Sequence, residues 1–179
     1  MNKLLSLVFT LVAVSCAACA GETPGDAAGQ IHVDIDRLVA AGEVVPVDGI
    51  TSAGQPDAAA LRVFADSGYK VIVDMRGPDE DRGLEDERGA VESLGMDYIA
   101  FPISDAGDIN FETARKLDEL LQDVEGPVLL HCASGNRVGA VLALRHRLTG
   151  ASPEESIEHG RNAGLTRLEG EVRDRLESE

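Results

Sequence analysis

The sequence predicts an α/β domain, a three-layer sandwich with a mainly parallel central sheet flanked by helices. Segments with strand character alternate along the chain with segments of helical periodicity, as in sheets whose parallel strands are joined by helices. Residues 71–73 and 128–130 are continuously apolar, which is typical of strands buried on both faces. We expect a ligand site at the carboxyl ends of these strands.

Glycine, proline and polar clusters divide the first half of the chain into short elements. Leu61, Phe64 and Ala65 share one helical face, and this helix should end at Gly68. Pro46 removes a backbone donor, so its segment is expected at a sheet edge. The expected elements are a short helix over 34–42, an edge strand over 44–47, a loop over 50–56, a helix over 57–67, a strand over 69–74 and a helix over 84–94.

In the second half, caps and helical periodicity mark the elements. Asn110 can cap a helix, and Ser152 followed by Pro153 is a typical helix start. The segment from Val138 to Arg147 begins apolar nearly all round, which predicts a buried helix. The expected elements are a strand over 96–102, a polar loop over 103–109, a helix over 110–124, a strand over 128–131, the buried helix, a helix from 152 and a last helix over 165–176.

The N-terminus is predicted to direct export. Lys3 precedes an apolar run over 4–14, which is too short to span a bilayer as an ordinary helix. Residues 13–16, Ala-Val-Ser-Cys, resemble a bacterial lipoprotein processing site with Cys16 as the lipidated residue. Cleavage near Gly21 without lipid, lipidation of Cys19 and an uncleaved anchor are the alternatives. We therefore assign 1–20 to a signal peptide, 21–32 to a tether and 33–179 to one domain in the cell envelope or periplasm.

Composition limits the classes of function. The net charge of −16 in 179 residues repels nucleic acid and anionic lipid headgroups, so no nucleic-acid partner is expected and the membrane is contacted through the lipid anchor only. The hydrophobic content of 44% is enough for one domain with a true core. Of three cysteines, only Cys132 belongs to the domain, so no internal disulfide is expected.

The segment 128–140 has the pattern of strand, tight loop and helix. An apolar run stops at His131 and Cys132, four small or polar residues follow, and Arg137 opens an apolar helix. Loop amides and the positive end of a helix dipole together form an anion-binding concavity. Free thiols titrate near ~8.5, but helix N-termini and cationic neighbours lower this to roughly 3.5–7.5. A thiolate beside a guanidinium suits phosphoryl chemistry or transfer of a similar group.

The motif His131-Cys132-x-x-Gly135-x-Arg137 resembles the signature loop of the protein tyrosine and dual-specificity phosphatase superfamily. Residues 52–56, 68–76, 95–98 and 126–132 extend the likeness to the bacterial beta-lactamase-hydrolase-like group, over about residues 45–175. The resemblance implies a phosphatase-like fold. It also implies hydrolysis of a phosphate monoester, on a phosphorylated protein or a small phosphorylated molecule, without a metal or cofactor.

The resemblance also implies roles for single residues. Cys132 attacks phosphorus and forms a cysteinyl-phosphate, Arg137 and the loop hold the phosphate oxygens, and His131 supports the loop. Asp105, 27 residues before the cysteine, is the favoured general acid, and Asp108 is the alternative. Residues expected to bind substrate through the loop are Ala133, Ser134, Gly135, Asn136 and Val138.

Two departures from the family pattern keep other functions open. Four residues separate Cys132 from Arg137, where phosphatases usually have five, and Val138 stands where many have Ser or Thr. The shorter loop is typical of rhodanese sulfurtransferases, in which the cysteine holds a persulfide. The alternatives are therefore sulfur transfer on Cys132 and a non-catalytic anion-binding module of the envelope. Arg76, at the end of a predicted strand, either binds an anion or pairs with a neighbouring acid.

Overall fold

The computed structural model describes residues 29–43, 49–81 and 83–178. Its centre is a five-stranded sheet in which every pair of neighbouring strands is parallel, in the order β1-β2-β5-β3-β4. This confirms the predicted α/β class with a parallel sheet. The strands are β1 (Gly29–Val33), β2 (Gly49–Ala53), β3 (Val71–Asp74), β4 (Asp97–Ala100) and β5 (Val128–His131).

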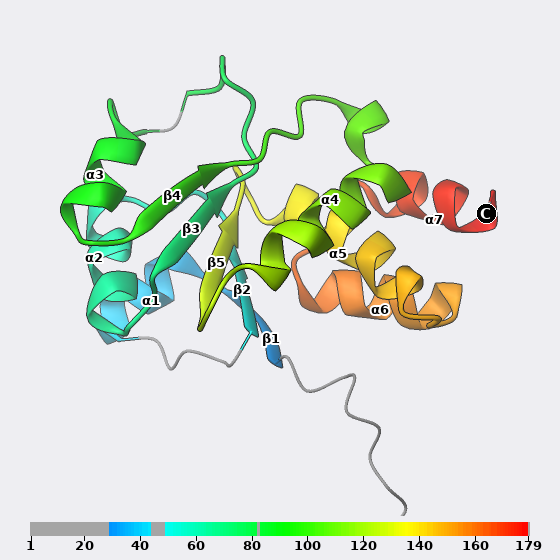
Figure 1. The fold of residues 1–179 in the computed structure, drawn as a ribbon, viewed down its shortest axis with the longest axis horizontal. Helices are drawn as coiled ribbons and strands as arrows, with labels where there is room; N and C mark the ends of the chain where they lie inside the picture. The colour runs from blue at the N-terminus through cyan, green and yellow to red at the C-terminus, as the bar shows by residue number, and fades with distance from the viewer. Residues whose placement is uncertain (1–28, 44–48, 82, 179) are drawn as a thin grey trace, which may run out of the picture.

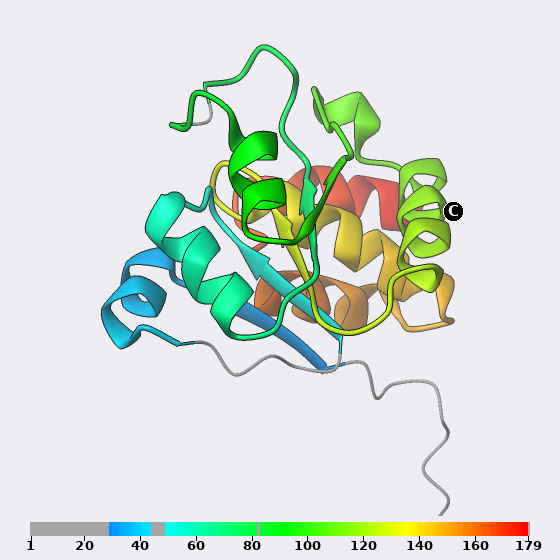
Figure 2. The same ribbon diagram turned by 60° about the vertical axis from the view of Figure 1, so that its left-hand side comes forward.

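Helices cover both faces of the sheet and complete the three layers (Figures 1 and 2). One face carries α1 (Ile35–Ala41), α2 (Ala58–Asp66) and α3 (Glu87–Ser93). The other carries α4 (Phe111–Gln122), α5 (Asn136–Leu148), α6 (Pro153–Asn162) and α7 (Glu169–Glu177). Two apolar cores result, and α5 is the most deeply buried helix, with Val138 to Leu144 all buried.

The expected loop over 50–56 is wrong, because residues 49–53 form the inner strand β2. The sequence of this strand contains the polar residues Thr51 and Ser52, which are typical of a loop. In the structure both are buried, and their hydroxyl groups form hydrogen bonds inside the protein. Thr51 is fully buried and its hydroxyl lies 2.5 Å from that of Tyr69. Ser52, also fully buried, donates to the Ala163 carbonyl at 2.8 Å. Hydrogen bonds of this kind remove most of the cost of burying a hydroxyl.

The domain boundary also differs from the expected one. Strand β1 begins at Gly29, so the end of the segment 21–32, assigned above to a tether, lies in the sheet. The expected signal peptide over 1–20, with Cys16, and the edge strand over 44–47 lie outside the described residues. Within the described part of the chain, no helix is both long and apolar enough to cross a bilayer.

The strand order places one loop at the middle of the sheet. β5 pairs with β2 on one side and β3 on the other, although it is last in the chain. At the end of β5, the His131 carbonyl accepts from the Met75 amide at 2.9 Å, and the amide of the next residue, Cys132, lies 3.5 Å from the Ala53 carbonyl. The loop after β5 therefore begins between the ends of its two neighbours, where sheets of this kind bind ligands.

Candidate active site

The loop between β5 and α5 leaves the helix N-terminus open. Gly135 precedes α5 with φ +80° and provides no side-chain cap. The first amides of a helix have no partner within it, and together with the helix dipole they attract an anion. A side chain at 135 would be strained by the positive φ, and its Cβ would approach within 2.5 Å of the His32 ring. Glycine is thus required where the loop turns into the helix.

Strand ends hold the loop from the side. Gly54 and Ser134 form an isolated antiparallel bridge, and the Gln55 amide donates to the Ala133 carbonyl at 3.3 Å. Ala133 and Ser134 are exposed, whereas Gly135 is buried. The segment after β2 therefore anchors the backbone of the loop, while Ala133 and Ser134 remain at the surface.

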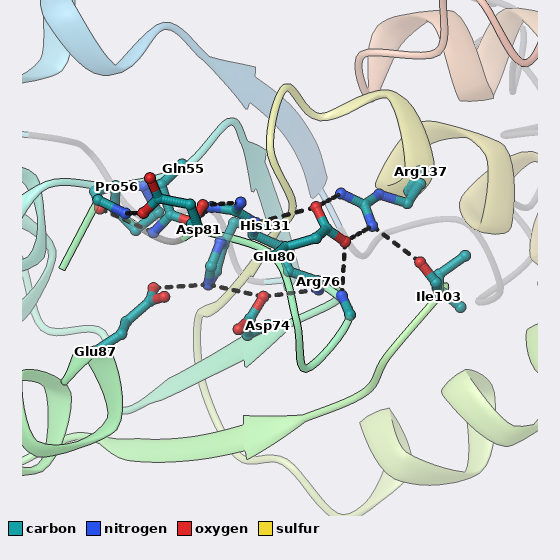
Figure 3. A network of polar contacts seen from close by, with 12 residues as sticks. Gln55, Pro56, Asp74, Arg76, Glu80, Asp81, Glu87, Ile103, His131 and Arg137 are labelled. Atoms are coloured by element: carbon teal, nitrogen blue, oxygen red, sulfur yellow. Dashed lines mark hydrogen bonds and ion pairs between the residues drawn. The ribbon is translucent and has the colours of Figure 1, made fainter. Parts of the chain in front are cut away.

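Arg137, in the first turn of α5, is fixed by acceptors from two other segments (Figure 3). It holds Glu80 through two bonds, Nη1 to Oε1 at 2.5 Å and Nη2 to Oε2 at 2.7 Å. Its Nη1 also donates to the Ile103 carbonyl at 2.9 Å. A guanidinium has five N–H groups, so these bonds occupy its outer edge and leave the donors on Nε and Nη2 that form its side edge. That edge can bind a second oxyanion through two bonds.

Glu80 lies among several donors. Besides Arg137, it accepts from the Gly77 amide at 2.7 Å and pairs with Arg76 at 3.4 Å. The hydrogen bond from Arg137 is the main cause that lowers the pKa of Glu80 to about 2. Arg76 also bonds to Gln55 and to the Asp81 carbonyl, so of its two interpretations the structure shows the pairing with a neighbouring acid.

Cys132 lies at the base of this arrangement. It is 1% exposed and is a free thiol, the one cysteine among the described residues. The pKa of Arg137 is raised first by its bond to Glu80, and the nearby Cys132 raises it further. The thiol, the guanidinium and the open helix end therefore come together as the sequence predicts.

A cleft of about 400 Å³ opens beside Arg137. Asp105 lies in its wall and is exposed, with its side chain capping a short turn at Gly107. Asp108 is not among the lining residues, since its carboxylate turns back to accept from the amides of Ser104 and Asp105. Of the two candidate acids, Asp105 is thus the one that faces the cleft. The lining residues are Glu80, Ile103, Ser104, Asp105, Ala106, Ile109, Arg137, Arg167 and Leu168.

Behind the loop, His131 lies between two buried carboxylates (Figure 3). Its Nε2 is 3.1 Å from Glu87 Oε1 and 3.9 Å from Asp74 Oδ1, and all three side chains are at most 1% exposed. Asp74 also accepts from the Tyr98 hydroxyl at 2.6 Å. His131 thus connects the start of the loop to α3 and β3.

The same three residues bear on metal binding. Asp74, Glu87 and His131 offer ligand atoms within 4.8 Å of one another, and in the described part of the chain they are the one group that could hold a metal ion. These residues lie far apart along the chain, so no spacing in the sequence marks them as a cluster. At 3.1 Å the contact between His131 and Glu87 has the distance of an ion pair, although the two atoms are not in hydrogen-bond geometry.

Two of the expected substrate-binding residues have structural side chains. Asn136 is buried, and its Oδ1 accepts from the segment between α6 and α7 rather than facing the cleft. Val138 is fully buried in the core between the sheet and α4–α7. Any contact of these two with an anion must therefore come from their backbone amides.

Sequence reasoning missed Glu80 and Glu87. Glu80 lies in the acidic run 79–81, which looks like a solvated turn, and its partner Arg137 is 57 positions away. Glu87 is 3% exposed, although the expected helix 84–94 gave no sign that an acid faces inward. A buried histidine at the end of a strand needs a partner, and that need was the one signal that pointed towards such an acid.

Comparison with known proteins gives a consistent result. Residues 49–174 match a family model described as DSP-PTPase phosphatase fused to NAD+ kinase. A beta-lactamase hydrolase-like protein of Agrobacterium fabrum is 31% identical over 112 residues, which are 61% of this chain and 26% of that protein. A protein of the same description from Xylella fastidiosa is 28% identical over 108 residues. The chain spans about a quarter of the length of these curated relatives.

Solved structures share the fold. A candidate phosphatase of Neisseria meningitidis superposes with a TM-score of 0.62 at 26% identity, covering 72% of this chain and 92% of that one. TpbA of P. aeruginosa, solved in complex with phosphotyrosine, covers 86% of this chain and 91% of its own, with a TM-score of 0.55 at 17% identity. At that identity the likeness shows the fold alone.

Proposed function

The chain belongs to the family of dual-specificity-type protein phosphatases, and from that membership we propose that it hydrolyses phosphate monoesters through Cys132. One observation carries the proposal. Arg137 holds Glu80 with its outer edge and keeps its side edge for an oxyanion, beside a thiol and an uncapped helix N-terminus. Such an arrangement stabilises the charge on a transferring phosphoryl group.

In the first step, the Cys132 thiolate attacks phosphorus, and the bond from phosphorus to the leaving oxygen breaks. Asp105, as the carboxylic acid, gives its proton to that oxygen. Arg137 and the amides of the loop hold the three equatorial oxygens. The products are the free alcohol or phenol and a cysteinyl-phosphate.

In the second step, the Asp105 carboxylate takes a proton from a water molecule, which attacks the phosphorus. The sulfur–phosphorus bond breaks, inorganic phosphate is released and the Cys132 thiolate returns. The proton that Asp105 gains restores it for the next cycle. The mechanism assigns no step to a metal ion or an organic cofactor.

The loop length supports sulfur transfer as a second candidate. With four residues between Cys132 and Arg137, the cradle is shorter than is usual for phosphatases. A sulfurtransferase would take a sulfur atom from a donor onto Cys132 as a persulfide. The two candidates differ in the adduct that Cys132 forms, so one measurement separates them.

We also propose that the protein is exported and anchored through lipid on Cys16, as the pattern at 13–16 suggests. A phosphatase in that place would act on phosphorylated proteins or small molecules of the cell envelope.

The test of the catalytic proposal is phosphate release from 4-nitrophenyl phosphate by the reduced protein. Cys132→Ser should lower the rate by at least about a hundredfold, because the nucleophile is lost. Asp105→Asn should lower it by roughly 10²–10⁴-fold. Asp108→Asn is the matched control; it keeps an oxygen for the two amides that Asp108 caps, so its effect should be much smaller.

The mass of Cys132 after rapid quenching identifies the chemistry. A phosphoryl gain with the aryl phosphate supports the phosphatase. A gain of one sulfur atom with thiosulfate, together with no phosphate release, would replace it by sulfur transfer. Neither adduct and no turnover would leave an anion-binding module.

A further inference from the structure

We propose that Arg167 binds a second anionic group of the substrate, so that the preferred substrates are phosphate monoesters with a further phosphate or carboxylate. The inference rests on the proposed function and extends it to the choice of substrate. Arg167 lies between α6 and α7 and lines the same cleft as Arg137. The two arginines would bind the two anionic groups of one molecule.

The position of Arg167 is fixed relative to the phosphate loop. Asn136, the residue before Arg137, uses its Oδ1 to accept from the backbone on both sides of Arg167. The donors are the amides of Thr166 at 2.8 Å and Leu168 at 3.3 Å, with the Thr166 hydroxyl at 3.1 Å. Asn136 is 6% exposed, so these bonds are shielded from water. The backbone at Arg167 is therefore held beside Arg137, while its guanidinium is exposed and open to an incoming anion.

Arg167 also has no carboxylate to neutralise it among the described residues. The nearest acid along the chain, Glu169, is committed elsewhere: it pairs with Arg161 at 2.7 Å and with Arg173 at 3.0 Å. In the described part of the chain, Arg37, Arg62 and Arg115 have no such ion pair either, but none of them lines the cleft beside Arg137. At the wall of a cleft, Arg167 provides a cation for an incoming anion.

The rest of the cleft suggests what joins the two anionic groups. Ile103 and Ile109 are buried, and with the half-buried Leu168 they supply an apolar wall. At about 400 Å³, the cleft has room for more than a phosphate group. An apolar or aromatic spacer between the two anionic groups fits this lining. Two kinds of molecule have two anionic groups joined by such a spacer. They are a phosphotyrosine next to an acidic residue and a small ring with two anionic substituents.

The experiment compares the intact protein on phenyl phosphate and on its 3-carboxy and 4-carboxy derivatives. For at least one derivative, kcat/KM should exceed that for phenyl phosphate. In Arg167→Gln that preference should fall by about tenfold, as expected for a hydrogen-bonded charge pair. Arg167→Lys should retain part of it. Arg62→Gln is the matched control, with the same change of charge on an exposed residue of α2, and should keep the preference.

A binding measurement separates this inference from the proposed function. Calorimetry with Cys132→Ser, alone and combined with Arg167→Gln, measures the affinity for the same three compounds without turnover. Tighter binding of a carboxylated compound that depends on Arg167 supports the inference even if no phosphate is released in the activity assay. Equal affinities for all three compounds, or an equal loss for all three in Arg167→Gln, would overturn it while leaving the phosphatase proposal intact.

Two further probes identify the source of the second anion. A phosphotyrosyl peptide with flanking Glu is compared with its Gln counterpart, and 1,3-phenylene bisphosphate is compared with phenyl phosphate. Dependence on Arg167 in the peptide pair alone indicates a phosphoprotein substrate. Dependence in the bisphosphate pair alone indicates a small molecule. If the preference depends on Arg167 in neither of these pairs and in none of the carboxylated compounds, the second anionic site is rejected.

Discussion

The site depends on how the donors of one guanidinium are divided. Arg137 uses three of its five N–H groups on Glu80 and on the Ile103 carbonyl, which fixes the plane of the side chain. A long flexible side chain normally loses entropy when it binds an anion, and the pre-positioned one loses less. Glu80 is thus a positioning residue, which holds Arg137 in place for an anion.

Glu80 should also make stability depend on pH at the acid end. Its folded pKa of about 2 lies below the ordinary 4.5, so its contribution is present above pH 4.5 and is lost as the pH falls through about 2. Because the side chain is 33% exposed, solvent screens the pair and we expect at most ~1 kcal/mol. Wild type should therefore melt about 2–4 °C above Glu80→Gln at pH 7.

Thermal melts of both proteins between pH 7 and pH 2 check this. The difference in Tm between them isolates Glu80, because the other carboxylates titrate in both. The difference should shrink from pH 4.5 downwards. A constant difference across this range would mean that the bond to Arg137 contributes nothing through its charge.

At the scale of elements, the crossing of α5 and α6 depends on glycine. A Cβ at Gly139 would lie 2.2 Å from the Leu165 amide nitrogen and 2.7 Å from the Gly160 carbonyl, both of which are backbone atoms. No side-chain rotation can relieve such a clash, so the helices must separate. This crossing also supports the segment that holds Arg167, which lies two residues after Leu165.

We therefore expect Gly139→Ala to destabilise the fold by at least the ~1–3 kcal/mol typical of overpacking, a loss of several degrees in Tm. Gly170→Ala is the matched control. Gly170 lies in α7 with nothing within 4 Å of its added Cβ, so alanine should stabilise that helix by roughly 0.5–1 kcal/mol. Opposite signs for the two variants support the interpretation, and a neutral Gly139→Ala would contradict the close crossing.

Most elements could be predicted because their patterns are local. The apolar strands β3 and β5 and the capped helices α4 and α6 are marked by residues within one or two turns. Strand β2 could not be predicted, because Thr51 and Ser52 are typical loop residues. Their hydroxyl groups find hydrogen-bond partners in Tyr69 and Ala163 only once the chain has folded. Such partners are set by tertiary structure, and a single sequence does not reveal them.

In the molecule as a whole, the site also has one part that local sequence patterns reveal and another that only tertiary structure brings together. The thiol, the loop and Arg137 lie within six consecutive positions, so the motif alone identifies them. Glu80 and Glu87 reach the loop from the connection between β3 and β4. The backbone that bonds to Asn136 comes from the segment between α6 and α7. The sequence therefore predicts the chemistry of the nucleophile, whereas the parts that orient it and select a substrate emerge only from the fold.

The proposed lipid anchor is a property of the whole chain that can be tested at its two N-terminal cysteines, Cys16 and Cys19. With a net charge of −16, the protein is repelled by anionic lipid headgroups, so stable attachment needs a covalent lipid. Cys16→Ser should move the protein from the membrane fraction to the soluble fraction and abolish incorporation of labelled fatty acid. Cys19→Ser is the matched control and should do neither. The reverse pattern would assign the lipid to Cys19, and no effect from either variant would reject a lipoprotein, because no other cysteine precedes the domain.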